Sequence, residues 1–144
     1  MTSSFAPRST APTASSASGA SRPLHVLVIE DNQDLAKLFC DLLEVMGCST
    51  AVALNGRSGL ESARTVAPDL VFCDLRLPGE KDGFAVAREL RADPVLGNMP
   101  LIAVTGLSAA QESARAFAAG FNKVFEKPIK FAQIQELLTL YGTK

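Results

Sequence analysis

The sequence has few of the residues on which disulfide frameworks, zinc sites and histidine-based catalysis depend. Its 144 residues include one histidine, His25, and three cysteines, none in a C-x-x-C spacing. An odd cysteine count without that spacing argues against a disulfide framework and a zinc site, and it is typical of a reducing compartment. A Ser-His-Asp relay would have to use His25, which stands at the head of an apolar run, so we do not expect one.

An excess of one charge and long apolar runs are also missing. The 14 basic and 15 acidic residues give a net charge of −1, and the basic residues are scattered. A nucleic-acid-binding protein usually carries a basic stripe, so no direct nucleic-acid contact is expected. No apolar run approaches the roughly 20 residues that a helix needs to cross a bilayer. We therefore expect a soluble, cytoplasmic protein that does not bind membranes.

Residues 1–23 differ in composition from the rest of the chain. They contain seven Ser, three Thr, five Ala and three Pro, and no acidic residue. A segment so poor in large apolar residues cannot bury enough surface to offset the entropy lost on ordering. We expect a disordered tail or linker there, followed by one domain over residues 24–144.

From residue 24 onward, short apolar runs alternate with amphipathic stretches. The apolar runs, interpreted as buried strands, are 24–29, 49–54, 70–73, 101–104 and 123–125. The expected helices are 34–46, 57–65, 84–91, 109–118 and 131–140. The first helix has its apolar residues at helical spacing, namely Leu35, Leu38, Phe39, Leu42 and Met46. Strand–helix units in strict alternation predict a parallel sheet with helices on both faces.

In such a sheet the ligand site lies beyond the carboxyl ends of the strands. Glu30 and Asp31 follow the first predicted strand, and Asp74 follows the third. Three carboxylates packed together would repel one another, and a bound Mg²⁺ with waters and a carbonyl would relieve that repulsion. The alternative, that these acids are solvated loop residues or helix caps, applies more easily to one of them than to all three.

Two further strand ends carry a hydroxyl and an ammonium group. Thr105 ends the fourth strand and is followed by the small Gly106, so a hydroxyl and a backbone N–H can approach an anion. Lys127 ends the fifth strand before Pro128, and an X-Pro bond can be cis and fix the turn that aims the lysine. Taken singly, Thr105 can be explained by the preference of threonine for strands, and Lys127 can be explained as a solvated surface charge.

The order of an acid pair, a single Asp, a Thr and a Lys-Pro pair resembles the receiver domain of two-component response regulators. The matching stretches are VLVIEDNQD, PDLVFCDLRLPGEKDG, PLIAVTG and FEKPI, within residues 24–140. The resemblance implies an α/β, doubly wound (βα)5, flavodoxin-like fold. In that fold, helices cover both faces of a five-stranded parallel sheet of order 2-1-3-4-5, giving three layers.

The resemblance also implies how a phosphoryl group would be held. Asp74 would be the phosphoacceptor, and Thr105 and Lys127 would bind phosphoryl oxygens. The backbone N–H groups of Leu75 and Gly106 would assist them.

Mg²⁺ is the implied cofactor, and a histidine kinase or histidine phosphotransfer protein is the implied phosphodonor. The implied metal ligands are Glu30, Asp31, Asp74 and the backbone carbonyl of Arg76. The domain would catalyse its own phosphorylation and dephosphorylation without being a conventional turnover enzyme. As a monomer or weak homodimer, it would switch a surface that binds a downstream protein.

One position departs from the family pattern. Receivers usually carry an aromatic residue three positions before the Lys-Pro pair, where this chain has Val124. Phe125 is adjacent, but neighbouring strand residues point to opposite faces, so we do not expect it to substitute. The thinly anchored helix 109–118 is the expected moving part. Arg76 and Leu107 flank the expected path of an attacking water, which predicts a long-lived phosphoryl group.

Other functions fit this sequence less well than a receiver does. A haloacid-dehalogenase-type phosphatase needs a second Asp where Arg76 stands, and a flavin module would not place the acidic loop 30–34 beside a phosphate. A degenerate receiver that binds proteins without phosphorylation is the remaining rival, although Asp31, Asp74 and Lys127 are all present. The sequence does not decide between a single-domain regulator and the receiver end of a hybrid kinase.

Overall fold

The computed structural model describes residues 23–142, which form ten elements in strict β–α alternation. The strands are β1 (His25–Ile29), β2 (Ser49–Ala53), β3 (Leu70–Asp74), β4 (Leu101–Thr105) and β5 (Lys123–Glu126). The helices are α1 (Gln33–Val45), α2 (Gly56–Val66), α3 (Gly83–Ala92), α4 (Ala109–Ala119) and α5 (Phe131–Gly142). Every predicted element is present within a residue or two of its predicted ends. The predicted tail, except for Pro23, lies outside the described residues.

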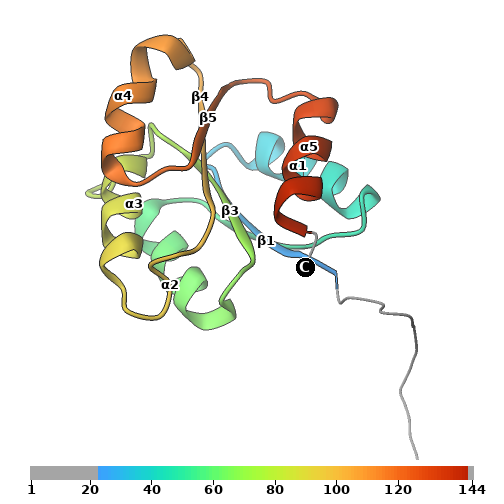
Figure 1. Cartoon of the computed structure of the whole chain (residues 1–144), viewed down its shortest axis with the longest axis horizontal. Coiled ribbons are helices and arrows are strands. Elements are labelled where there is room, and N and C mark those ends of the chain that lie inside the picture. Colours follow the sequence, from blue (N-terminus) through green and yellow to red (C-terminus); the bar gives the residue numbers. More distant parts are fainter. Residues whose placement is uncertain (1–22, 143–144) are drawn as a thin grey trace, which may run out of the picture.

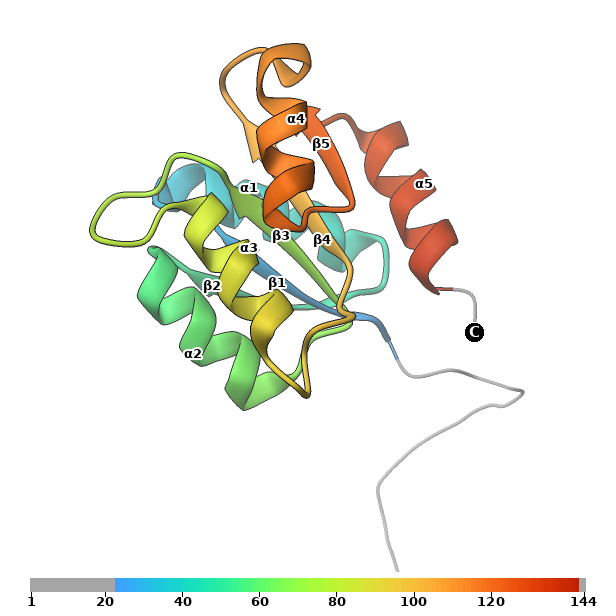
Figure 2. The same ribbon diagram turned by 60° about the vertical axis from the view of Figure 1, so that its left-hand side comes forward.

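All five strands pair in parallel in the order β2-β1-β3-β4-β5. Helices α1 and α5 lie on one face of the sheet and α2, α3 and α4 on the other, giving three layers (Figures 1 and 2). This arrangement confirms the predicted doubly wound fold and its strand order. Because the order reverses between β1 and β3, the chain leaves these neighbouring strands toward opposite faces, and a crevice opens at their carboxyl ends.

The sheet separates two apolar cores, and alternate residues of each central strand point into each core. In β1, Leu27 and Ile29 pack under α2, α3 and α4, whereas Val26 and Val28 pack under α1 and α5. All five residues of β3 are buried, as expected of a strand covered on both faces. The central strands are therefore held from both sides, and their carboxyl ends are fixed in position.

The face on which α1 packs differs in part from the prediction. Leu35 and Leu38 were expected on the buried stripe, but they are 44% and 57% exposed. The residues of α1 that are buried are Ala36, Cys40 and Leu43. Small side chains at two of these positions let the helix lie close to the sheet, and this rotates the larger leucines outward. The pattern of apolar residues alone does not choose between two overlapping stripes.

Candidate functional site

Three carboxylates meet at the carboxyl ends of β1 and β3. Glu30 and Asp31 follow β1 directly, and Asp74 is the last residue of β3. One carboxylate oxygen from each residue lies within 4.8 Å of the other two. Glu30 and Asp74 are buried and Asp31 is exposed, so the cluster faces solvent on one side. Oxygen donors of this kind and spacing fit Mg²⁺, which prefers carboxylates and keeps several waters.

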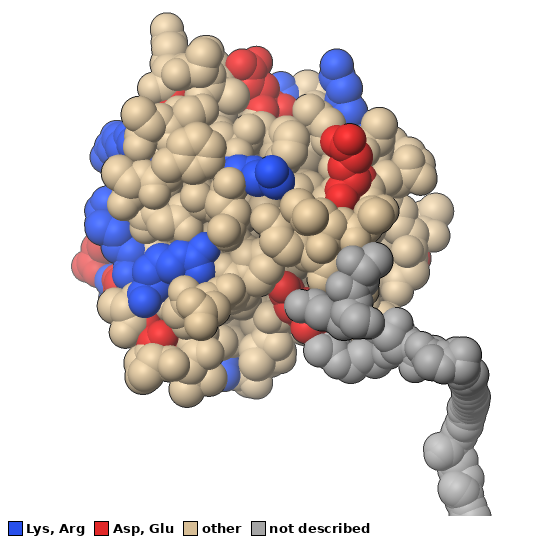
Figure 3. Space-filling view, viewed as in Figure 1, with Lys and Arg blue, Asp and Glu red and all other residues tan. Residues whose placement is uncertain are grey.

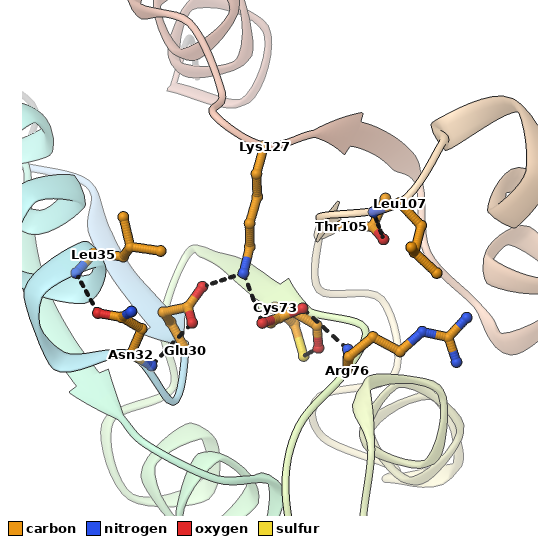
Figure 4. A network of polar contacts seen from close by, with 9 residues as sticks. Glu30, Asn32, Leu35, Cys73, Arg76, Thr105, Leu107 and Lys127 are labelled. Carbon is orange, nitrogen blue, oxygen red and sulfur yellow. Dashed lines mark hydrogen bonds and ion pairs between the residues drawn. The ribbon is translucent and has the colours of Figure 1, made fainter.

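Lys127 joins the two buried carboxylates. Its Nζ lies 2.8 Å from Oε1 of Glu30 and 2.8 Å from Oδ2 of Asp74, and Figure 4 shows the side chain reaching down from the loop after β5. The Lys127–Pro128 bond is cis, the form that the sequence allowed for. The lysine therefore compensates part of the negative charge that the cluster gathers.

The electrostatics of this cluster are governed by burial and by Lys127. Burial raises the pKa of Glu30, although hydrogen bonds from Lys127 and from the backbone N–H of Asn32 oppose that shift. Burial alone would lower the pKa of Lys127, but its hydrogen bonds and charge interactions with Asp74 and Glu30 outweigh burial, and the pKa is raised. Lys127 thus stays a cation at neutral pH.

The loop after β1 places Asp31 toward solvent. Asn32, at the N-cap of α1, accepts a 3.0 Å hydrogen bond from the N–H of Leu35 through its side chain, and its own N–H donates to Glu30. Since Asn32 is the cap, Asp31 is not needed there. Within residues 23–142 the Asp31 carboxylate has no hydrogen bond or ion pair, so it is available to a ligand.

The two backbone N–H groups that follow Asp74 have different partners. The N–H of Leu75 donates to the carbonyl oxygen of Val104 at 3.2 Å, as a continuation of the pairing between β3 and β4. The N–H of Arg76 donates to Oδ1 of Asp74 at 3.0 Å. In the unmodified protein the N–H of Arg76 thus faces the carboxylate. The role of the Leu75 N–H in binding phosphoryl oxygens stays a prediction.

The loop after Asp74 returns close to the strand before α3 begins. A Cβ atom at Gly83 would lie 2.3 Å from the carbonyl oxygen of Asp74, so only glycine allows this approach. The N–H of Gly83 donates to the carbonyl oxygen of Leu75 at 3.0 Å, and Asp82 caps α3 by accepting from the N–H of Ala85. Both ends of the loop are therefore anchored, and the Asp74 backbone with them.

Thr105 lies at the end of β4, one residue beyond the partner of Asp74 in the β3–β4 register. Its side chain is fully buried, and its hydroxyl oxygen accepts a hydrogen bond from the N–H of Leu107 at 3.0 Å. The hydroxyl proton remains available for donation to an anion. A Cβ at the neighbouring Gly106 would meet nothing within 4 Å, so its backbone borders open space.

The sequence analysis missed the partner of the Arg76 side chain. The guanidinium forms an ion pair with Glu112 of α4, 36 residues away, and lies 5.7 Å from the centre of the Phe84 ring. Figure 4 shows the Arg76 side chain extending away from Lys127 toward Leu107. Glu112 is an isolated acid in an Ala-rich stretch, and no local pattern links it to Arg76.

Val124, at the usual aromatic position, and the adjacent Phe125 lie on opposite faces of the sheet, as predicted. Val124 packs against the core under α2, α3 and α4, whereas Phe125 packs against the core under α1 and α5. Phe125 is thus on the wrong side of β5 to replace an aromatic residue at position 124. Coupling between Thr105 and α4 cannot run through an aromatic ring at Val124.

An apolar groove runs beside the carboxylates, between α1 and the loop after β5. Its lining consists of Glu30, Leu35, Leu38, Phe39, Leu42, Val104, Lys127, Pro128 and Ile129. The groove explains the exposure of the outward leucines of α1, because they form one of its walls. It shares Glu30 and Lys127 with the acid cluster, so a molecule seated in it would lie next to that cluster.

Comparison with known proteins identifies the family. Residues 26–139 match the model of the response regulator receiver domain. The chain belongs to this family. It is therefore a receiver of two-component signalling, in agreement with the resemblance of its motifs.

Relatives of this receiver include a response regulator and part of a kinase. The polar-differentiation response regulator DivK of Brucella anthropi is 35% identical over 119 residues, covering 83% of this chain and 96% of that protein. A CheY-like receiver domain from Methylobacillus flagellatus is similar with a TM-score of 0.74 at 31% identity, covering 83% and 98%. The receiver domain of sensor histidine kinase PA1611 from Pseudomonas aeruginosa PAO1 has a TM-score of 0.76 at 28% identity, covering 84% and 99%. The structure of that kinase domain contains a magnesium ion in its active-site cleft.

The outer surface and helix lengths add two observations about this receiver. On the face shown in Figure 3, basic side chains gather on the side where α3 lies in Figure 1, with acidic ones among them. Within residues 23–142, no helix combines the length and apolar character required of a membrane span.

Proposed function

We propose that this receiver accepts a phosphoryl group on Asp74 in a Mg²⁺-dependent reaction, and that the modification switches a protein-binding surface. The observation that carries the proposal is the convergence of Lys127 on Glu30 and Asp74 beside the exposed Asp31. Such a site combines a nucleophile with a cation and metal ligands, the parts that phosphoryl transfer requires.

Mg²⁺ would be held by the carboxylates of Asp31 and Asp74, the carbonyl of Arg76 and, through water, by Glu30. When bound, it supplies positive charge that neutralises the oxygens of the transferring phosphoryl group. The oxygen-only donor set and the solvent-facing Asp31 support this assignment.

In the transfer step, a carboxylate oxygen of Asp74 attacks phosphorus while the bond from phosphorus to the donor's imidazole nitrogen breaks. An oxygen–phosphorus bond forms, and the electron pair of the broken bond stays on the imidazole. Lys127 would move its contact from the Asp74 carboxylate, now 2.8 Å away, to a phosphoryl oxygen. Thr105 and the N–H groups of Arg76 and Gly106 would bind the other oxygens.

The partners follow from the surfaces at the site. The phosphodonor would be a histidine kinase or a histidine phosphotransfer protein, seated in the apolar groove so that its histidine meets Asp74. Phosphorylation would change the surface around α4 and so its affinity for a downstream protein. We propose a monomer or weak homodimer, acting either alone or as the receiver end of a hybrid kinase.

Arg76 and Leu107 are proposed to lengthen the life of the phosphoryl group by restricting the approach of water. The Leu107 side chain is 50% exposed beside Thr105, and Figure 4 shows the Arg76 side chain extending toward it. The mass of purified phosphoprotein, followed over time in Mg²⁺ buffer, should show slow loss of the group. Rapid loss would contradict this part of the proposal.

The decisive experiment is incubation with Mg²⁺ and acetyl phosphate, an acid quench and measurement of the intact mass. We expect a gain of one phosphoryl group in the wild type and none in Asp74→Asn or without Mg²⁺. Asp41→Asn is a matched control, because Asp41 is an exposed aspartate of α1 paired with Lys37. If neither acetyl phosphate nor histidine kinases modify the wild type, the unphosphorylated binding module becomes the better function.

A further inference from the structure

The ion pair between Arg76 and Glu112 connects the loop between β3 and α3 to α4. Arg76 lies two residues after Asp74, and Glu112 lies in the first turn of α4. The Glu112 side chain is 11% exposed, whereas the Arg76 side chain is 47% exposed. The two ends of this pair are therefore unequal, with a buried carboxylate held by a cation that solvent also reaches.

Glu112 occupies an unusual place in the described chain. Among residues 23–142, it is the only buried carboxylate outside the acid cluster. An exposed ion pair contributes little, but a buried carboxylate that loses its cation is strongly unfavourable. The other buried residues of α4 are Ala116 and Ala119, and Phe117 is half exposed. Apolar packing of α4 is thus slight, and its first turns are held by the Arg76 ion pair and by a 2.8 Å hydrogen bond from the N–H of Ala109 to the Glu126 carboxylate.

Two other cations lie in this region. Arg115, three residues after Glu112 on α4, lies over the Phe84 ring at 4.0 Å and makes no ion pair within the described chain. Lys127 is engaged by Glu30 and Asp74. If Arg76 leaves Glu112, the carboxylate loses its ion pair and has to turn toward Arg115 or water, and the first turns of α4 have to adjust.

We infer that the Arg76–Glu112 pair is an electrostatic latch that holds α4 while Asp74 is unmodified and opens when Asp74 is phosphorylated. The latch rests on the proposed function, because the phosphoryl group provides the competing anion. That group adds up to about two negative charges and strong acceptor oxygens. The N–H of Arg76 already lies 3.0 Å from Oδ1 of Asp74, and a guanidinium binds phosphate oxygens in a favourable two-pronged geometry. The exposed guanidinium can therefore exchange Glu112 for the phosphoryl group.

This latch gives the site a route to α4 that does not need an aromatic residue on β5. Val124 provides no ring to follow a movement of Thr105, and Phe125 lies on the other face of the sheet. The latch acts instead through charge, from the loop after β3 directly to α4. Arg76 is thus assigned as a positioning residue for α4 in addition to its backbone role at Asp74.

The test is amide hydrogen exchange of α4 in the unmodified protein, because exchange reports local opening of a helix. Arg76→Gln leaves Glu112 buried and alone, and we expect exchange in residues 109–119 to rise on the order of tenfold. Glu112→Gln removes the buried charge and leaves Arg76 in solvent, so the rise should be smaller, about threefold. The double variant should resemble Glu112→Gln, since no buried charge remains.

Glu89→Gln is the matched control. Glu89 lies on α3 and pairs with Lys81, which belongs to the same loop between β3 and α3 as Arg76. Loss of the Glu89–Lys81 pair should therefore leave hydrogen exchange in α4 unchanged. Exchange in β3 and the urea midpoint of each variant separate local opening from general destabilisation. The latch is wrong if Arg76→Gln and Glu112→Gln match Glu89→Gln, or if their effects on α4 simply add in the double variant.

A second arm uses phosphorylated protein whose modification is verified by intact mass. Exchange in α4 should rise on phosphorylation of the wild type toward the level of Arg76→Gln, and should change little on phosphorylation of Glu112→Gln. If the wild type gains the group but α4 does not respond, the latch fails and the proposed function stands. If the wild type gains no group, the proposed function fails, and the unmodified variants alone decide whether the pair holds α4.

Discussion

Helices α1 and α4 both border the proposed phosphorylation site, yet they are attached to the rest of the domain in different ways. The N-terminus of α1 is capped by the Asn32 side chain, and Ala36, Cys40 and Leu43 on this helix are buried. Phe39 adds an edge-to-face contact with Phe72 of β3, with ring centres 4.7 Å apart. Helix α1 directly follows the loop that contains Glu30 and Asp31, and its contacts leave it little freedom to move.

Helix α4 is attached mainly by polar contacts. Ser108, at its N-cap, makes no side-chain capping hydrogen bond in the described chain, but the Glu126 carboxylate of β5 accepts a 2.8 Å hydrogen bond from the N–H of Ala109. Two of the three buried residues of α4 are alanines. The third is Glu112, whose burial depends on Arg76. The comparison teaches that the α1 side of the site is a rigid support for the proposed metal ligands, whereas the α4 side is held by charge. The proposed phosphorylation of Asp74 would change charge, so it would act on the α4 side.

The largest effect should come from replacing Lys127, the cation that contacts the buried carboxylates of the site. Lys127→Met keeps the length of the side chain but leaves the buried Glu30 and Asp74 without their ammonium group. We expect the rate of phosphoryl uptake from acetyl phosphate to fall roughly a hundredfold, as on loss of other preorganised charge-stabilising groups. Lys130→Met, at an exposed site, serves as the control, and equal rates in the two variants would remove Lys127 from the reaction.

Truncation of one apolar side chain on each helix should separate their anchoring. Leu43 is fully buried on α1, and Leu43→Ala should lower the free energy of unfolding by about 2–5 kcal/mol. Phe117 is 51% exposed on α4, and Phe117→Ala should change it by about 0.5 kcal/mol or less. Urea unfolding of the two variants measures both values. A loss at Phe117 comparable to that at Leu43 would show that α4 is anchored by packing after all.

The smallest effect concerns the helix caps. The side chain of Asn32 accepts from the N–H of Leu35, so Asn32→Ala should destabilise the domain by about 1 kcal/mol. Ser108→Ala should be nearly neutral, because the Ser108 side chain makes no capping bond. The pair is measured by urea unfolding under one buffer condition, and equal losses at both caps would weaken the contrast between α1 and α4.

Much of this receiver was predictable because the signals involved are local. Strand and helix order follow from short apolar runs and amphipathic stretches, and strand ends follow from where those runs stop. Since parallel strands end at one edge of the sheet, Glu30, Asp31 and Asp74 were expected together before any coordinates. The opposite orientation of Val124 and Phe125 also follows from strand geometry alone.

Other features could not be predicted in this way. The rotation of α1, with Leu35 exposed, depends on how closely small residues let the helix approach the sheet. The N–H of Arg76 donates to the Asp74 carboxylate, whereas the N–H of Leu75 donates to the neighbouring strand. Each outcome is set by packing or pairing with a part of the chain that is distant in sequence.

The sequence by itself determined the alternating fold and the set of charged groups at the carboxyl edge of the sheet, because both depend on local periodicity and on strand ends. Only the tertiary structure decided which charged side chains pair with one another. Lys127 meets Asp74 across 53 residues, and Arg76 meets Glu112 across 36. Such pairs depend on distances of a few ångströms between separate loops and helices. They also depend on burial, as for the Glu112 carboxylate, which is paired with Arg76. Those distances arise only when the two cores close around the sheet.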